Sequence, residues 1–192
     1  MGKKSEALIV GLTGKNASGK GETARLLQKF GYQYHSLSDI LRKEAAKRGL
    51  SDTRESLVEL GQTLREQEGA GVLAKRMLQL LEGRNYVIDS IRSPSEVIVL
   101  KKLDHFLLIG IDAPIQLRFG RAMKRGRNES ADSLDDFKRM EERENSSNPL
   151  AQQLDECLRL ADCIIQNNGT LEQLEIKLIY FLSDHKFPIK GP

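Results

Sequence analysis

The sequence has few cysteines and no long apolar run, and these absences exclude several classes of protein. Its 192 residues include 2 cysteines. These are Cys157 and Cys163, whose spacing fits no metal-binding motif and which we interpret as small apolar side chains near a helix-to-strand junction. No apolar stretch approaches the ~18 residues of a membrane span. The N-terminal residues offer neither the apolar segment of a signal peptide nor a serine placed for myristoylation. We therefore expect a soluble cytoplasmic protein without a membrane partner.

An excess of one charge is also absent, since 30 basic residues face 27 acidic residues and the net charge is +3. This near balance gives no reason to expect a nucleic-acid partner, although a local group of arginines can still bind phosphates. With 39% hydrophobic residues, the chain is long enough to bury the core of one globular domain. It has no internal repeat and no low-complexity linker, so we expect residues 1–192 to form a single domain.

Short apolar runs rich in β-branched residues alternate with helical patterns along the chain. The runs that predict strands are Ala7–Leu12, Tyr32–His35, Tyr86–Asp89, His105–Ile111 and Asp162–Gln166. The helical patterns between them include Gly21–Phe30, Leu57–Gly69, Gly71–Leu81, Ser93–Lys102 and Pro114–Lys124. Such alternation predicts an α/β fold in which helices cover both faces of a parallel sheet.

One octapeptide carries the clearest chemical signal, because it lies between the first predicted strand and a predicted helix. It consists of Gly14, Lys15, Asn16, Ala17, Ser18, Gly19, Lys20 and Gly21. The pattern Gly-x-x-x-x-Gly-Lys in this setting is typical of a phosphate-binding loop. Its glycines let successive backbone N–H groups surround an anion, and its lysine reaches the terminal phosphates. Gly21 stands where serine or threonine usually holds magnesium, which argues against GTPases and motor ATPases and favours small nucleotide kinases.

The end of the third predicted strand adds an acidic and a basic residue. Asp89 lies at the carboxyl end of a strand expected beside the phosphate-binding loop. From there a carboxylate can reach Mg²⁺ directly or through water. Arg92, three residues later, is suited to bind a second phosphate with two parallel hydrogen bonds. A helix cap and a surface arginine are the alternative interpretation of these two residues.

Two further segments place arginines near the expected ligand. After the second strand, Ser38 or Asp39 is suited to cap a helix, and Arg42 on its first turn would face the strand ends where ligands bind in open α/β sheets. Arg121 and Arg125 are four residues apart and share one helix face. Because like charges so placed repel each other, we expect a triphosphate as their partner, with Arg121 suited to stack on an adenine ring.

Two stretches depart from the alternation of strands and helices. Residues 36–82 carry helical patterns without a strand, and residues 125–150 are strongly polar. A polar, charge-mixed stretch is usually a solvated helix. After the fourth strand of such a fold it is also where a mobile lid is expected. With the end of the preceding helix included, we assign residues 121–150 to a lid region.

Taken together, these segments resemble the P-loop nucleoside and deoxynucleoside monophosphate kinases. The Gly-Lys-Gly of the loop, residues 38–42 and residues 89–92 are similar to motifs of adenylate kinase, and the pattern around Arg65 looks like deoxynucleoside monophosphate kinases. Over nearly all of residues 7–180 the chain is most similar to archaeal-type proteins described as adenylate-kinase-related or dephospho-CoA-kinase-like. The resemblance implies a three-layer P-loop kinase fold with a five-stranded parallel sheet. It also implies an acceptor-binding helical insert at residues 36–82 and a lid.

The resemblance further implies ATP as the phosphoryl donor, Mg²⁺ as the metal and a small-molecule nucleotide as the substrate of a monomer or homodimer. Residues 14–23 would hold ATP. Within them Glu22 stands where the family has threonine, so Thr23 is expected to substitute at the α-phosphate. Arg121 and Arg125 would contact the ATP base and phosphates. The acceptor would be bound by residues at the strand ends and in the helical insert, namely Asp39, Arg42, Arg65 and Arg92, and the metal by Asp89.

The sequence leaves three functions open. The leading hypothesis is ATP-dependent phosphoryl transfer to a nucleoside or deoxynucleoside monophosphate, with Lys20, Arg92, Arg121 and Arg125 clamping the transferred group. The first alternative is transfer to a hydroxyl, as in dephospho-CoA kinases, for which Asp39 would be the carboxylate near that hydroxyl. The second is a nucleotide-sensing module that binds ATP without turnover, which the departures from the usual loop pattern keep open.

Overall fold

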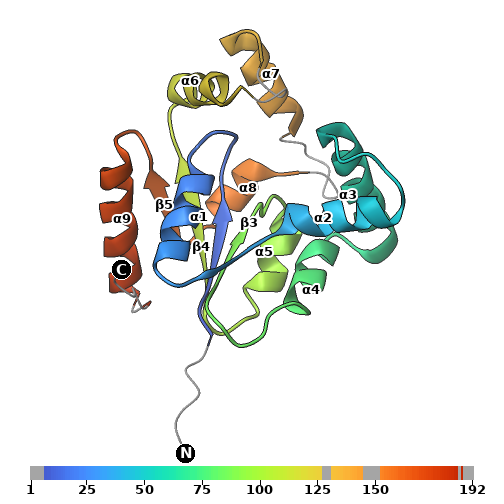
Figure 1. Ribbon diagram of the computed structural model, residues 1–192, viewed down its shortest axis with the longest axis horizontal. Coiled ribbons are helices and arrows are strands. Elements are labelled where there is room, and N and C mark those ends of the chain that lie inside the picture. The colour runs from blue at the N-terminus through green and yellow to red at the C-terminus, as the bar shows by residue number, and fades with distance from the viewer. Residues whose placement is uncertain (1–6, 127–130, 145–151, 186, 188–192) are drawn as a thin grey trace, which may run out of the picture.

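The computed structural model describes residues 7–126, 131–144, 152–185 and 187, and a sheet of five strands lies at its centre (Figure 1). The strands are β1 (Ile9–Thr13), β2 (Gln33–Ser36), β3 (Tyr86–Asp89), β4 (Phe106–Asp112) and β5 (Cys163–Gln166). They lie in the order β2-β3-β1-β4-β5, and each neighbouring pair is parallel. The predicted parallel α/β sheet is therefore confirmed, with strand ends shifted by a residue or two from the predicted bounds.

Helices connect the strands and cover the sheet. They are α1 (Lys20–Lys29), α2 (Leu37–Lys47), α3 (Arg54–Glu68), α4 (Val72–Leu78), α5 (Pro94–Leu100), α6 (Ile115–Arg125), α7 (Leu134–Glu144), α8 (Leu154–Arg159) and α9 (Leu171–Asp184). Within the described ranges, none of these helices combines the length and the apolar character that a membrane crossing requires.

Successive residues of the strands pack on opposite faces of the sheet, which explains the three layers. Ile9 and Ile88 belong to one core with residues of α2 to α5 and α8. Their neighbours Val10 and Val87 belong to a second core with residues of α1 and α9. Strands buried on both faces read as near-continuous apolar runs, and this is the pattern from which the sequence predicted them. Figure 1 shows α9 and α1 on the side of the sheet opposite to α4 and α5.

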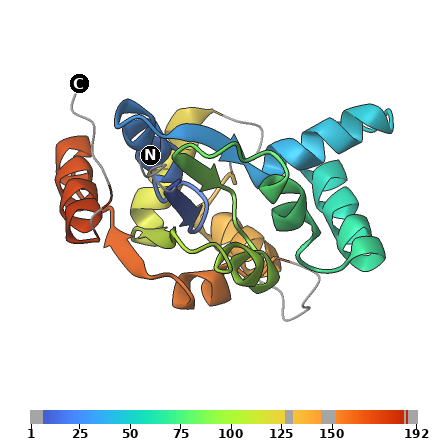
Figure 2. The same ribbon diagram turned by 90° about the horizontal axis from the view of Figure 1, so that it is seen from below.

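Three helices between β2 and β3 form the helical part of residues 36–82, and both views show α2 and α3 extending away from the sheet on the side opposite to α9 (Figures 1 and 2). The Ser36 hydroxyl oxygen caps α2 by accepting a hydrogen bond from the Ser38 N–H at 3.3 Å. The expectation that Ser38 or Asp39 is the cap was wrong. Ser36, the last residue of β2, has the extended backbone that a cap requires.

The carboxyl ends of the strands gather on one edge of the sheet because all strands are parallel. The register pairs Ser36 of β2 with Asp89 of β3. Helices α6 and α7 lie beyond this edge (Figure 1), and Phe137 of α7 shares a small apolar cluster with Ala17 and Ala122. Residues 127–130 and 145–150 of the predicted lid lie outside the described residues, so the lid assignment stays a prediction.

Candidate active site

The loop between β1 and α1 curls tightly over the carboxyl edge of the sheet. Gly14 and Gly19 have φ angles of 143° and 114°, which favour glycine. A Cβ atom at Gly14 would lie 2.1 Å from the Ile111 carbonyl oxygen, and one at Gly19 would lie 2.1 Å from Nδ2 of Asn167. The two glycines therefore allow both the backbone turn and its close approach to β4 and to the segment after β5.

Lys20, the first residue of α1, folds back over this loop. Its Nζ donates to the carbonyl oxygens of Gly14 at 2.6 Å and Lys15 at 3.0 Å. Burial lowers the pKa of Lys20 from 10.5 to about 8, the Asp89 carboxylate opposes that shift, and Arg92 and other arginines add to it. A bound anion would reverse the shift by stabilising the charged amine, so the position of Lys20 fits a phosphate group in the loop.

Neighbouring elements hold the loop from behind. Asn167 Nδ2 donates to the Ser18 carbonyl at 2.8 Å, and Lys15 pairs with Asp155 of α8 at 2.9 Å. Arg121 donates to the carbonyl oxygens of Asn167 at 2.9 Å and Ser18 at 3.4 Å. Arg121 thus contacts the loop backbone, and it is not among the residues that line the cleft in the described part of the chain.

The two residues after Gly21 differ in their surroundings. Thr23 is fully buried, and its hydroxyl donates to the Gly19 carbonyl at 3.2 Å. Its expected role at the α-phosphate therefore has no counterpart in this arrangement, because the hydroxyl stabilises the first turn of α1 instead. Glu22 lies at the cleft and pairs with Arg25.

Asp89 is the last residue of β3 and lines the cleft together with the residues of the loop. Its Oδ1 accepts a hydrogen bond from the Ser90 N–H at 2.6 Å, and its Oδ2 accepts a long one from the Tyr34 hydroxyl at 3.4 Å. Among the described residues, no group of three or more metal-binding side chains is present. A single carboxylate would suit Mg²⁺ held mainly by nucleotide oxygens and water and not an all-protein cage, so Asp89 as the metal ligand stays a prediction.

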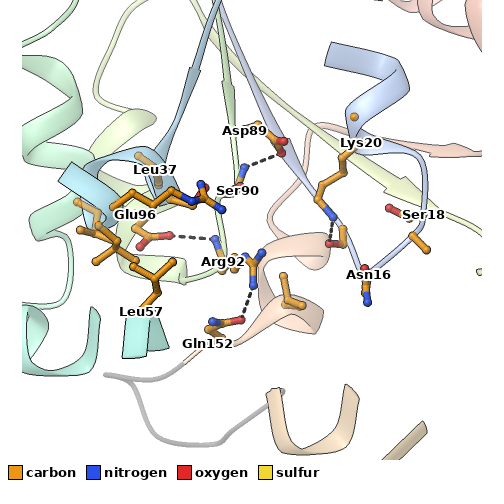
Figure 3. A pocket seen from close by; sticks show the side chains of 18 of the residues that line it. Asn16, Ser18, Lys20, Leu37, Leu57, Asp89, Ser90, Arg92, Glu96 and Gln152 are labelled. Carbon is orange, nitrogen blue, oxygen red and sulfur yellow. Dashed lines mark hydrogen bonds between the residues drawn. The ribbon is translucent and has the colours of Figure 1, made fainter. Parts of the chain in front are cut away.

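Three arginines from separate elements face this loop across the cleft. Arg42 comes from α2, Arg65 from α3 and Arg92 from the turn between β3 and α5, and all three line the cleft with Leu41 and Leu57 on the apolar wall. The cleft has a volume of about 680 Å³. Figure 3 shows Lys20 on one side and Arg92 and Leu57 on the other. The predicted acceptor arginines are thus brought together with the loop lysine.

Glu96, which the sequence analysis did not assign to the site, holds two of these arginines. Its Oε1 accepts from the Arg65 guanidinium at 3.1 Å, and its Oε2 accepts from the backbone N–H groups of Arg92 at 2.9 Å and Ser93 at 3.1 Å. The Arg65 side chain is 6% exposed, that of Glu96 is 1% exposed, and Nε of Arg65 has no hydrogen-bond partner. The Ser-x-x-Glu capping box at residues 93–96 was the sequence signal that marks Glu96.

Arg42 is oriented by its own helix. It donates to Asp39 Oδ1 at 2.9 Å and to the Ser38 hydroxyl oxygen at 3.0 Å. Asp39 does not itself line the cleft. The arrangement therefore places Asp39 beside Arg42, where it can orient the guanidinium, and its predicted role at a hydroxyl acceptor stays a prediction.

Arg118 is a second residue that the sequence analysis did not assign. It is almost fully buried and donates to the carbonyl oxygens of Ala113 at 2.8 Å and Asn16 at 3.3 Å. Its guanidinium also forms a bidentate pair with Glu141 of α7. Arg125, at the end of the same helix, is exposed and lines the cleft. No local pattern marks Arg118, because its partners lie on other elements.

The loop, the sheet order and this cleft define a P-loop kinase-like domain, and residues 13–138 match a family model described as an AAA domain. The chain belongs to the UPF0200 family. It is 31% identical over 182 residues to the UPF0200 protein of Methanosarcina barkeri, and the matched region covers 92% of this chain and 95% of that protein. It is 33% identical over 180 residues to the UPF0200/UPF0201 protein of Archaeoglobus fulgidus and spans about half (54%) of that relative's length.

Solved structures agree on the fold. Shikimate kinase from Acinetobacter baumannii, in complex with shikimate, matches with a TM-score of 0.58 and 15% identity, over 94% of this chain and 95% of that chain. At this identity the likeness shows the fold alone. The expected α/β P-loop kinase fold is therefore confirmed.

Proposed function

We propose that this protein is an ATP-dependent phosphotransferase that acts on a small phosphorylated metabolite, a nucleoside or deoxynucleoside monophosphate. One observation carries the proposal: Arg42, Arg65 and Arg92 line the same cleft as Lys20. Guanidinium groups bind phosphate oxygens with paired hydrogen bonds. Three of them on the acceptor side fit a substrate that already carries a phosphate.

The donor side supports ATP as the second substrate. The backbone N–H groups of the loop and the N-terminus of α1 bind the phosphates, and Lys20 reaches the terminal ones. Mg²⁺, when bound beside Asp89, neutralises charge on the β- and γ-phosphate oxygens. Arg125, which is exposed and lines the cleft, adds a further cation for the phosphates.

The acceptor side supports a nucleotide over a bare phosphate. Leu37, Leu41, Leu57, Val58 and Leu73 form an apolar wall beside the arginines. Such a wall excludes water from a flat base while the arginines hold the phosphate. A phosphate acceptor is already anionic and needs no general base, so catalysis consists of alignment and charge stabilisation.

Transfer to a hydroxyl is the competing proposal, and the likeness to a shikimate kinase with bound shikimate is what favours it. Such an acceptor benefits from a carboxylate within reach of its proton. Asp39 was the candidate, but it pairs with Arg42 and does not line the cleft. The monophosphate proposal therefore has the better support.

The test is a coupled assay of ADP release with purified protein and Mg-ATP. The acceptor panel contains the nucleoside and deoxynucleoside monophosphates, dephospho-CoA, shikimate and a blank without acceptor. We expect at least one monophosphate to raise turnover far above the blank, with a diphosphate as product. Turnover only with dephospho-CoA or shikimate would replace the proposal with hydroxyl transfer. ATP binding without turnover on any acceptor would replace it with a sensing role.

A further inference from the structure

Ser90, which directly follows β3, has an unusual backbone conformation. Its φ angle is 65°, and among the described residues the only other positive φ at a non-glycine position is that of Ala17 in the phosphate-binding loop. A serine in the left-handed region is strained where glycine would not be. Figure 3 shows Ser90 between Asp89 and Arg92 in the wall of the cleft. The position therefore invites the question of what the serine side chain provides.

The Ser90 hydroxyl ends a chain of hydrogen bonds that begins at Arg42. Arg42 donates to the Ser38 hydroxyl oxygen at 3.0 Å, the Ser38 and Ser36 hydroxyl oxygens are 2.8 Å apart, and Ser36 donates to Ser90 at 3.0 Å. Because Ser36 has one hydroxyl proton and gives it to Ser90, Ser38 must donate to Ser36. Every proton in the chain therefore points from the arginine toward Ser90.

The hydroxyl proton of Ser90 is the last in this chain. Among the described residues, no acceptor for it is present, and Ser90 lines the cleft. Hydrogen bonds in such a chain polarise one another, and the cation at its start makes each following hydroxyl a better donor. The chain thus presents a strengthened donor to whatever binds beside Arg92.

A second, independent observation points to an anion at this place. The Arg65 side chain is only 6% exposed and lines the same cleft as Ser90. Its Nε has no hydrogen-bond partner. A buried N–H group without a partner is costly, and native structures normally satisfy it. Nε itself has almost no accessible surface, so an oxyanion in the cleft would be attracted by the charge of the Arg65 guanidinium and would not accept from Nε.

We propose that Ser90 is an acceptor-binding residue whose hydroxyl donates a hydrogen bond to an oxygen of the acceptor phosphate, beside Arg65 and Arg92. The proposal rests on the proposed function for the identity of that phosphate. It assigns to the Ser38–Ser36–Ser90 chain the task of linking Arg42 to the same phosphate. The proposal also gives a reason for serine at this position, since glycine would suit the backbone better but has no hydroxyl.

The test uses inorganic phosphate as the probe. Calorimetric titration of phosphate into the full chain, saturated with Mg²⁺ and the β,γ-imido analogue of ATP, reports binding outside the occupied phosphate loop. We expect Ser90→Ala and Ser90→Gly to weaken phosphate binding by about 10- to 100-fold, as for other hydrogen bonds to charged groups. Ser95→Ala, a serine of α5 that does not line the cleft, should bind phosphate like the parent. Affinity for the ATP analogue should be the same in all four proteins.

Ser90→Gly separates the hydroxyl from the backbone. If the serine mattered only for the turn, glycine would bind phosphate as tightly as the parent, and that result would overturn the proposal. Unchanged phosphate binding in Ser90→Ala, or no phosphate binding by the parent beside the ATP analogue, would overturn it as well. Thermal unfolding of each variant checks that the fold is retained.

The two proposals fail separately. Phosphate binding that depends on Ser90, in a protein that transfers phosphate to no monophosphate, would leave the acceptor site intact and remove the proposed reaction. Transfer to a monophosphate with the same acceptor KM in Ser90→Ala as in the parent would keep the reaction and remove Ser90 from the site.

Discussion

The donor and acceptor sides of the cleft are built in different ways. The donor side comes from one continuous stretch, residues 14–20, in which backbone groups and Lys20 face the ligand. The acceptor side is assembled from Arg42, Arg65 and Arg92 on three separate elements. Backbone N–H groups bind any phosphate alike, whereas single substitutions can change the binding side chains one at a time. Under the proposed function, the loop would fix the donor chemistry, and acceptor choice would reside in the helical insert and the β3–α5 turn.

The largest expected effect is on the donor side. Lys20→Ala should lower turnover by about 10²- to 10³-fold, because it removes a charge aimed at the transferred phosphoryl group. The fold should be retained, since the amine bonds only to loop carbonyls. Steady-state kinetics and thermal unfolding measure the two effects, and Lys29→Ala at the exposed end of α1 is the matched control. Turnover within tenfold of the parent would exclude the loop from the reaction.

Arg92→Ala should distinguish the two sides. It removes an acceptor-side guanidinium, so acceptor affinity should fall by about 10- to 100-fold while affinity for the ATP analogue changes much less. Separate titrations of the two ligands measure this. Arg159→Ala, an exposed arginine of α8 that pairs with Glu156, is the control and should leave both affinities unchanged. An equal loss for ATP and acceptor would remove Arg92 from the acceptor side.

ATP affinity on the donor side should also depend on pH, whereas phosphate binding by the acceptor arginines should not depend on pH in this way. Lys20 has a pKa of about 8 in the ligand-free protein because of its burial. Phosphate binding favours the charged amine, so above that pKa binding must take up a proton. ATP affinity should therefore be flat below about pH 8 and fall above it, approaching about tenfold per pH unit.

Calorimetry in buffers with different ionisation enthalpies would show the proton uptake directly. Lys20→Ala supplies the control, because it should bind ATP weakly and without this pH dependence. A parent protein whose ATP affinity is unchanged between about pH 7 and pH 10 would contradict the assignment of the lowered pKa to ligand binding.

The smallest expected effect is at Asp39. Its ion pair with Arg42 is half exposed, and the Ser38 hydroxyl still contacts Arg42 when the carboxylate is lost. Asp39→Asn should thus change turnover within about fivefold, the range of exposed ion pairs. A loss of about 10²- to 10⁴-fold with ATP affinity preserved would instead mark a general base and a hydroxyl acceptor.

The conformation of the loop between β1 and α1 was predictable because its determinants are local, while its role in binding the phosphoryl donor stays a prediction. The turn lies between one strand and one helix, and it is defined by the spacing of Gly14, Gly19 and Lys20 along the chain. The five strands were predictable for a related reason. In the central strands β1, β3 and β4, residues buried on both faces produce apolar runs of strand length, whereas the edge strands β2 and β5 are partly exposed. The strand ends shifted by a residue or two.

The arginines that line the cleft were predictable from the sequence, but their contacts were not. Their role in binding the acceptor stays a prediction. Arg65 meets Glu96 across 31 residues of sequence, and Arg92 meets Gln152 across 60. Such pairs depend on how α3, α5 and α8 pack against each other, which no spacing rule gives. Thr23 shows the converse case, since a hydroxyl that looked available to ATP is used within α1. Composition and motif predict the kind of side chain, and packing decides what it touches.

Arg118 adds polar contacts between the loop and α7, two parts of the molecule that also meet through Ala17 and Phe137 in their apolar cluster. The same guanidinium donates to the Asn16 carbonyl in the loop and pairs with Glu141 of α7. Energetic coupling between two binding events is reciprocal. Any change in α7 that alters nucleotide affinity through Arg118 must therefore be matched by an equal effect of nucleotide on α7. The occupancy of the loop and the position of α7 are then linked through one buried arginine, and a shift in either one shifts the other.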